Sequence, residues 1–178
     1  LEGEKNIQDT FKSSVILRPS VVFGPEDKFF NTFASLAQFS PALPLVGGGK
    51  TKFAPIYVGD VAKAIVKALE LNNSEPKIYE LGGPENYSFK ELMEILLKEI
   101  KKKRFLIPIP FGFAKFQSYF MQVMPKPLLT PDQVEMLKYD NIVSGDYKTL
   151  KDLGITGTSI QSILPKYIYR FRTGGQFG

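Results

Sequence analysis

Residues 15–27 read VILRPSVVFGPED, a short apolar run followed at once by residues that end regular structure. The run Val15 to Leu17 is typical of a parallel strand covered on both faces. Pro19 has no amide proton to donate to a neighbouring strand, so we expect the strand to end there. Further along the chain, apolar strands alternate with amphipathic helices. This alternation predicts an α/β fold with parallel strands.

Local signals divide the rest of the chain into elements. Gly47 to Gly49 predict a tight turn, Asp60 is expected to cap a helix, and Ser88 opens a capping box with Glu91. Thr130 and Pro131 form a second helix start, and later Gly154 and Ser159 mark a helix end and a helix start. We expect strands at 14–18, 51–58, 77–81 and 105–109, and helices at 1–12, 28–40, 61–71, 88–100 and 111–124.

Composition excludes several classes of site. The 178 residues are 43% hydrophobic, enough for one globular domain with a sizeable core. The chain has no cysteine and no histidine, which excludes a disulfide framework, a Ser-His-Asp triad and most zinc sites. The net charge of +5 comes from dispersed basic residues, so we predict no nucleic-acid partner. One basic cluster stands out, at Lys101, Lys102, Lys103 and Arg104, and a solvated helix end explains it as well as a ligand does.

Two apparent catalytic motifs fail on closer reading. Gly49-Lys50-Thr51 resembles the end of a P-loop, but the glycine required five residues earlier is Pro44. A GxGxxG loop for a dinucleotide pyrophosphate does not occur in the 178 residues. The neighbouring acids Glu26 and Asp27 are interpreted as exposed loop residues. We therefore predict no catalytic residue and no metal ligand in this chain.

The aromatic stretch from Phe111 to Met124 has two interpretations. Phe113, Phe116, Phe120 and Val123 recur at the spacing of a helix face that packs in a core, and core packing is our prediction. The alternative is peripheral contact with a membrane or a protein partner, made together with the basic cluster at 101–104.

Three segments carry a family resemblance. They are ILRPSVVFGP at 16–25, YVGDVAKAI at 57–65 and YELGGP at 79–84. In this order and spacing they resemble the C-terminal half of extended short-chain dehydrogenase/reductases. They are most similar to an atypical group that includes a nucleotide-binding accessory subunit of respiratory complex I and its bacterial relatives. The resemblance covers almost the whole chain.

The resemblance implies a fold and a set of site residues. The fold would be the C-terminal portion of an NAD(P)-binding Rossmann-like domain with a mostly helical substrate-side subdomain. Residues 1–178 would be the C-terminal half of that domain, with the glycine loop and the Tyr-x-x-x-Lys pair before Leu1. NAD or NADP would be held by the full-length protein and bound weakly, or not at all, by this chain. The expected nicotinamide contacts are Pro19, Ser20, Val21 and Val22, and the expected substrate-side residues are Phe23, Phe29 and Tyr57.

The residues alone allow a simpler reading of the nicotinamide contacts. Pro19 would merely end a strand, and Val21 and Val22 would fill the core. With the resemblance, we expect a complex I accessory or assembly component that holds a structural nucleotide. The alternatives are an active NAD(P)-dependent reductase or epimerase acting on a small substrate such as a nucleotide sugar, and a basic, aromatic interaction module. The expected location is the bacterial cytoplasm or the mitochondrial matrix, peripheral to the inner membrane and with protein partners.

Overall fold

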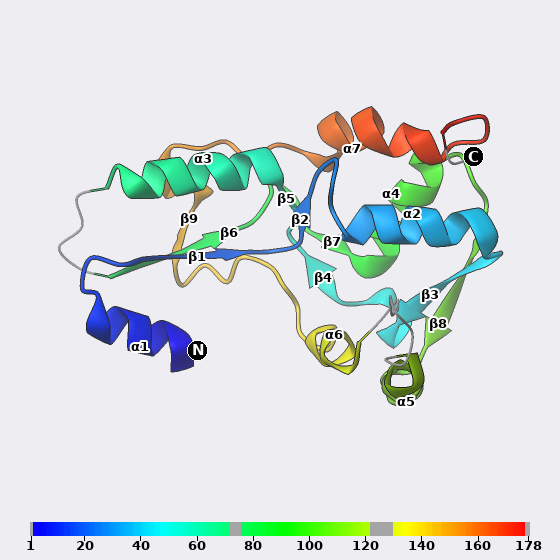
Figure 1. Cartoon of the computed structure of the whole chain (residues 1–178), viewed down its shortest axis with the longest axis horizontal. Helices are drawn as coiled ribbons and strands as arrows, with labels where there is room; N and C mark the ends of the chain where they lie inside the picture. Colours follow the sequence, from blue (N-terminus) through cyan, green and yellow to red (C-terminus); the bar gives the residue numbers. More distant parts are fainter. Residues whose placement is uncertain (1, 72–75, 122–129, 177–178) are drawn as a thin grey trace.

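The computed structural model describes residues 2–71, 76–121 and 130–176, and Figure 1 shows their arrangement. Strands and helices alternate along most of the chain, as the sequence predicts. The helices are α1 (Glu2–Thr10), α2 (Phe29–Phe39), α3 (Val58–Leu69), α4 (Phe89–Glu99), α5 (Phe111–Met121), α6 (Pro131–Met136) and α7 (Ile160–Ile168), with short 3₁₀ turns η1 (Gly47–Gly49), η2 (Leu150–Leu153) and η3 (Tyr169–Phe171). The strands are β1 (Val15–Pro19), β2 (Val22–Phe23), β3 (Ala42–Val46), β4 (Lys52–Phe53), β5 (Ile56–Tyr57), β6 (Lys77–Leu81), β7 (Tyr87–Ser88), β8 (Phe105–Ile109) and β9 (Lys148–Thr149).

The first sheet has the order β1-β6-β9, and both of its pairings are parallel. Strand β1 ends at Pro19, as predicted, opposite Leu81 of β6. Helix α3 covers one face of this sheet and α1 lies on the other side (Figure 1). The first four residues of β1 are partly buried, and Val15 and Leu17 pack against an apolar cluster that includes Tyr79 and Leu81. On the α1 side, Arg18 makes two hydrogen bonds to Glu4, at 2.8 and 2.7 Å.

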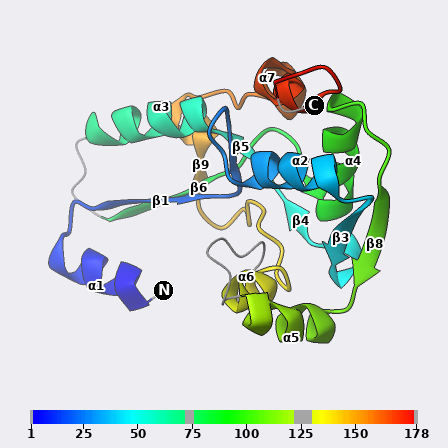
Figure 2. The same cartoon turned by 45° about the vertical axis from the view of Figure 1, so that its right-hand side comes forward.

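A second, mostly helical part follows the strand ends. Helices α2, α4 and α7 pack together around a buried apolar cluster that includes Phe30, Leu92 and Leu164. Strands β3 and β8 pair in parallel beside them, and α5 and α6 lie at the far end of this pair (Figures 1 and 2). This arrangement confirms the predicted helical subdomain.

Local capping signals act as predicted at the starts of α4 and α6. Ser88 and Glu91 form a reciprocal capping box at α4, and Thr130 and Gln133 form another at α6. The turn Gly47–Gly49 has positive φ at each glycine, between 61° and 71°, a region that side chains with a Cβ rarely adopt. These short-range rules depend on neighbouring residues only, which explains their success.

Two predicted boundaries are wrong. The expected strand at 51–58 is two short strands, β4 and β5, because the amide of Ala54 leaves the strand pattern and donates to the Asn141 carbonyl at 3.1 Å. Helix α3 starts at Val58, so Asp60 lies inside its first turn and does not cap it.

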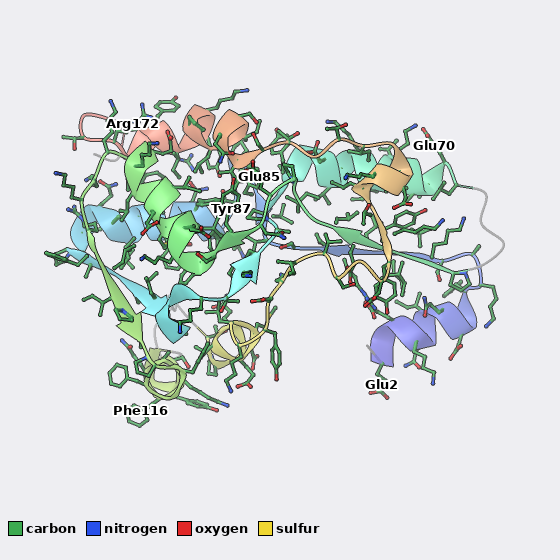
Figure 3. The ribbon with its side chains drawn as sticks, turned by 180° about the vertical axis from the view of Figure 1, so that it is seen from behind. Glu2, Glu70, Glu85, Tyr87, Phe116 and Arg172 are labelled. Atoms are coloured by element: carbon green, nitrogen blue, oxygen red, sulfur yellow. The ribbon has the colours of Figure 1, made fainter. Side chains whose placement is uncertain are left out.

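Helix α5 corrects the core interpretation of the aromatic stretch. Phe113 and Phe116 are 60% and 63% exposed, while the small residues Ala114 and Ser118 are buried. Ala114 packs in a cluster with Val46 of β3 and Val134 of α6, so the small side chains face inward and the rings face outward. Figure 3 shows Phe116 on the outer side of the helix. The Phe120 side chain and residues 122–124 lie outside the described part.

Candidate functional site

The predicted nicotinamide contacts lie where β1 and β6 end side by side. Pro19 is exposed at the strand end, whereas Ser20 is buried. The Ser20 hydroxyl donates to the Asn141 carbonyl at 2.7 Å and accepts from the Ala54 amide at 3.2 Å. Val22 then pairs with Ile56 in a short parallel ladder. Ser20 therefore joins three segments that are distant in sequence, and its hydroxyl is already used within the fold.

A cavity of about 760 Å³ opens at this strand end, and we call it the strand-end cavity. Three predicted site residues, Val21, Val22 and Phe29, line it. Pro19, Ser20, Phe23 and Tyr57 are not among its lining residues. The described residues that line it are Val21, Val22, Lys28, Phe29, Thr32, Phe33, Pro44, Val46, Phe53, Phe89, Gln133, Met136, Leu137, Tyr139, Asp140 and Asn141.

Four phenylalanines in this lining form one aromatic cluster, the aromatic floor. They are Phe29 and Phe33 of α2, Phe53 of β4 and Phe89 of α4. The Phe29 ring centroid lies 5.5 Å from that of Phe33, 6.2 Å from that of Phe53 and 6.0 Å from that of Phe89. These separations suit edge-to-face and tilted ring contacts, so the rings hold one another in place.

Half of the polar residues in this lining, Tyr139, Asp140 and Asn141, come from segment 137–141, which the sequence analysis did not assign to the site. Asn141 donates its amide to the Lys52 carbonyl at 2.8 Å, and the Asp140 carboxylate accepts the Lys52 amide at 2.8 Å. These two hydrogen bonds to β4 hold the segment beside the cavity. The local sequence pattern could not predict the position of this segment, because the position depends on hydrogen bonds to β4 and not on neighbouring residues.

Two predicted substrate-side residues, Phe23 and Tyr57, pack in the apolar core and do not line the cavity. Phe23 is fully buried in the main apolar cluster, and Tyr57 packs against that cluster. Their ring centroids are 5.9 Å apart. They thus support the strand β2 that carries Val22.

Asp27 corrects the interpretation of the loop acids. Its carboxylate accepts the Phe30 amide of α2 at 2.6 Å and the hydroxyl of Tyr167, in α7, also at 2.6 Å. Burial, together with the negative charge of Asp27, raises the pKa of the Tyr167 hydroxyl far above its usual value. Asp27 therefore stabilises the start of α2 and ties it to α7.

Asp60 is fully buried and has a different role from the cap that the sequence predicts. Its carboxylate accepts the backbone amide of Thr158 at 2.7 Å and the Lys63 ammonium at 2.9 Å. Burial alone would raise the pKa of this carboxyl, but the hydrogen bonds from Thr158 and Lys63 outweigh it and hold the pKa below its ordinary value. Asp60 thus fastens the segment before α7 to the first turn of α3.

Two features are absent from residues 2–71, 76–121 and 130–176. Within them, His, Cys, Asp and Glu side chains do not gather in a group of three that could hold a metal ion. Over the same residues, the helices fall short of the length and apolar character needed to cross a bilayer.

The apolar contacts at Val21 and Val22 fit one part of a dinucleotide. Half-buried valines at the end of a parallel strand offer surface to a planar ring such as nicotinamide, in the position where open α/β sheets place ligands. A pyrophosphate, in contrast, needs a glycine loop at a helix N-terminus, and the sequence contains no GxGxxG.

Comparison with known proteins agrees with this architecture. Residues 4–88 match the 3-beta hydroxysteroid dehydrogenase/isomerase family. The mitochondrial NADH dehydrogenase [ubiquinone] 1 alpha subcomplex subunit 9 of Arabidopsis thaliana is 33% identical over 97% of this chain and 46% of its own length. The Mus musculus subunit of the same name is 32% identical over 96% of the chain and 46% of its length. The chain thus spans about half the length of these relatives.

Solved structures extend the likeness to the fold. The dTDP-glucose 4,6-dehydratase DesIV of Streptomyces venezuelae, solved with NAD bound, has a TM-score of 0.61 at 17% identity, over 94% of this chain and 46% of its own. The UDP-glucose 4-epimerase of Thermus thermophilus, also complexed with NAD, has a TM-score of 0.58 at 20% identity, over 96% of this chain and 50% of its own. The chain is homologous to the complex I subunits named above over almost its whole length, and it shares the fold of this NAD-bound dehydratase and epimerase.

Proposed function

We propose that the chain is the substrate-side part of an NAD(P)-binding accessory subunit of respiratory complex I. The observation that carries the proposal is the similarity to the Arabidopsis subunit, which runs over 97% of the chain. The parallel strands and the helical subdomain support it, because they match the extended dehydrogenase fold of NAD-bound proteins. In this proposal the protein works at the matrix or cytoplasmic side of the inner membrane.

The first test is assembly. A tagged full-length protein, expressed in its own cells, should migrate with NADH dehydrogenase activity on a native gel. Deleting the gene should lower the amount of assembled complex. Migration of the tagged protein apart from that activity, together with unchanged complex after deletion, would refute the proposal.

The nucleotide has a proposed place at Val21 and Val22. The ring would contact these valines, and residues outside this chain would hold the pyrophosphate. In the full-length protein, Val22→Asp should weaken NADPH binding at least tenfold, because a carboxylate in this apolar contact must be desolvated. Val66→Asp, at a position on α3 that is 55% exposed, is the matched control. Calorimetry that finds equal affinity in Val22→Asp and Val66→Asp would exclude this placement.

Peripheral membrane contact has support in one surface of the molecule. The basic cluster at 101–104 and the exposed rings of α5 lie at opposite ends of β8, and Phe105 and Ile107 of that strand are 77% and 49% exposed. Part of the basic cluster also serves the fold, since Arg104 donates to the Ala37 carbonyl at 2.9 Å. We propose that this strip lies against an anionic lipid surface.

Vesicle cosedimentation tests the strip. The protein should sediment with vesicles that contain phosphatidylglycerol, and the double change Phe113→Ser and Phe116→Ser should reduce the bound fraction severalfold. Tyr169→Ser, at a site 56% exposed on η3, is the control for loss of an exposed ring. Equal sedimentation of the double variant and the control would rule out contact through α5.

A further inference from the structure

We infer that the strand-end cavity binds an uncharged, largely apolar molecule of the acyl-chain or isoprenoid class, and not a nucleotide sugar. The inference rests on the proposed function for one point only, that the nicotinamide ring reaches the cavity at Val21 and Val22. It also rests on three features of the cavity: the charge of its lining residues, the capped N-termini of the helices beside it, and its volume and apolar surface.

The charge of the lining argues against a diphosphate. A nucleotide sugar carries two negative charges on its pyrophosphate, and protein sites meet such groups with arginine and lysine side chains. Among the described residues that line the cavity, Lys28 is the single basic residue and Asp140 is an acid. Their formal charges cancel, so the described residues of the lining carry no net positive charge to meet a diphosphate.

The helix N-termini beside the cavity are also occupied. A free helix N-terminus can bind phosphate through its unpaired amides. At the start of α2, however, the Asp27 carboxylate accepts the amides of Phe30 and Asn31 at 2.6 and 3.3 Å. At α4 and α6, the capping boxes Ser88–Glu91 and Thr130–Gln133 take the same role. Each of these three helices contributes lining residues, and each has at least one first-turn amide bound to one of the protein's own side chains.

The shape and surface of the cavity suit an apolar body. Its volume of about 760 Å³ lies within the range of roughly 300 to 1,000 Å³ that small-molecule sites occupy. The aromatic floor supplies rigid apolar contact, and Val46 and Leu137 add aliphatic surface. Thr32 and Gln133 are also lining residues, and the Thr32 hydroxyl and the Gln133 Nε2 are suitable partners for one neutral polar end such as an alcohol or a carbonyl, while the Gln133 Oε1 accepts the Thr130 amide.

Calorimetry on the purified full-length protein distinguishes the ligand classes. The probes are farnesol, dodecanol and UDP-glucose. Farnesol or dodecanol should bind at least tenfold more tightly than UDP-glucose, and whichever of the two binds more tightly assigns the isoprenoid or the acyl class. Binding of UDP-glucose as tight as that of both alcohols, or failure of both alcohols to bind, would overturn the inference. This result is separate from comigration with complex I, so the two proposals can fail independently.

A matched pair of variants locates the bound probe. Thr32→Trp fills the cavity from α2 and should weaken binding of the preferred alcohol at least tenfold. Ser35→Trp, at an exposed position of the same helix, should leave it unchanged. Met136→Lys adds a charge to the lining at a residue that is 69% exposed, and it serves if Thr32→Trp does not fold. Undiminished binding in the folded cavity variants would show that the alcohol binds elsewhere and would refute the inference.

Discussion

Asp60→Ala should destabilise the protein by about 2 to 4 kcal/mol. The largest part is the hydrogen bond from the Thr158 amide to the buried carboxylate, since a bond to a charged group contributes about 1.5 to 3 kcal/mol. The negative charge in the first turn of α3 adds about 0.3 to 1 kcal/mol through the helix dipole. The ion pair with Lys63 adds little, because the Lys63 side chain is 62% exposed.

Two further variants separate these contributions. Asp60→Asn keeps an oxygen that can accept the Thr158 amide but loses the charge, so it should cost about half as much as Asp60→Ala. Lys63→Ala should cost less than about 1 kcal/mol. Urea unfolding followed by circular dichroism gives all three values. Equal losses in Asp60→Asn and Asp60→Ala, or a loss below about 1 kcal/mol in Asp60→Ala, would refute the role assigned to the Thr158 bond.

The lowered pKa of Asp60 also predicts a pH dependence. A carboxyl with a lower pKa in the folded state contributes stability that is fully present above its unfolded pKa, which is about 3.9. That contribution is lost as the pH falls through the folded-state value. Wild-type protein should therefore lose more stability than Asp60→Asn on acidification from about pH 5 to about pH 2. Parallel curves for the two proteins in urea unfolding at each pH would contradict this linkage.

Three other substitutions test contacts that stabilise the fold. Gly83→Ala should prevent stable folding, because the new Cβ would lie 1.9 Å from the Pro55 carbonyl oxygen. Gly112→Ala is the control: its Cβ would meet nothing within 4 Å, so the melting temperature should stay unchanged or rise slightly. Ser20→Ala should cost about 1 to 3 kcal/mol in urea unfolding, since the Asn141 carbonyl loses its buried donor. Ser88→Ala should cost about 0.5 to 2 kcal/mol through loss of the α4 cap, and a cost as large as that of Gly83→Ala would contradict the capping account.

The sequence predicted those features that depend on near neighbours. The end of β1 at Pro19, the capping box at Ser88 and the glycine turn at 47–49 follow from backbone rules that act within a few residues. The parallel pairing of the main strands was also predicted, because strands that alternate with helices usually pair in parallel.

The rest of the site depends on contacts between distant segments. Asp60 is a plausible cap by local rules, yet its carboxylate binds Thr158, which the packing of α7 brings to it. Phe113 and Phe116 have the spacing of a core face, but Ala114 allows the opposite face of α5 to pack more closely. Likewise, segment 137–141 reaches the cavity through β4. Local periodicity cannot distinguish these outcomes.

The pairing of distant strands has a consequence for how this chain folds. Val15 pairs with Lys77, and Ala42 pairs with Phe105, so each parallel ladder closes a long loop before it gains any contact. Such high contact order slows folding, because the entropy of loop closure is lost before packing compensates it. The hydrogen bond from the Tyr167 hydroxyl to the Asp27 carboxylate also joins residues that are far apart in the sequence, so it can form only after α7 has been synthesised. During synthesis on the ribosome, the core around α2 therefore stays incomplete, and open to chaperones, until α7 has emerged.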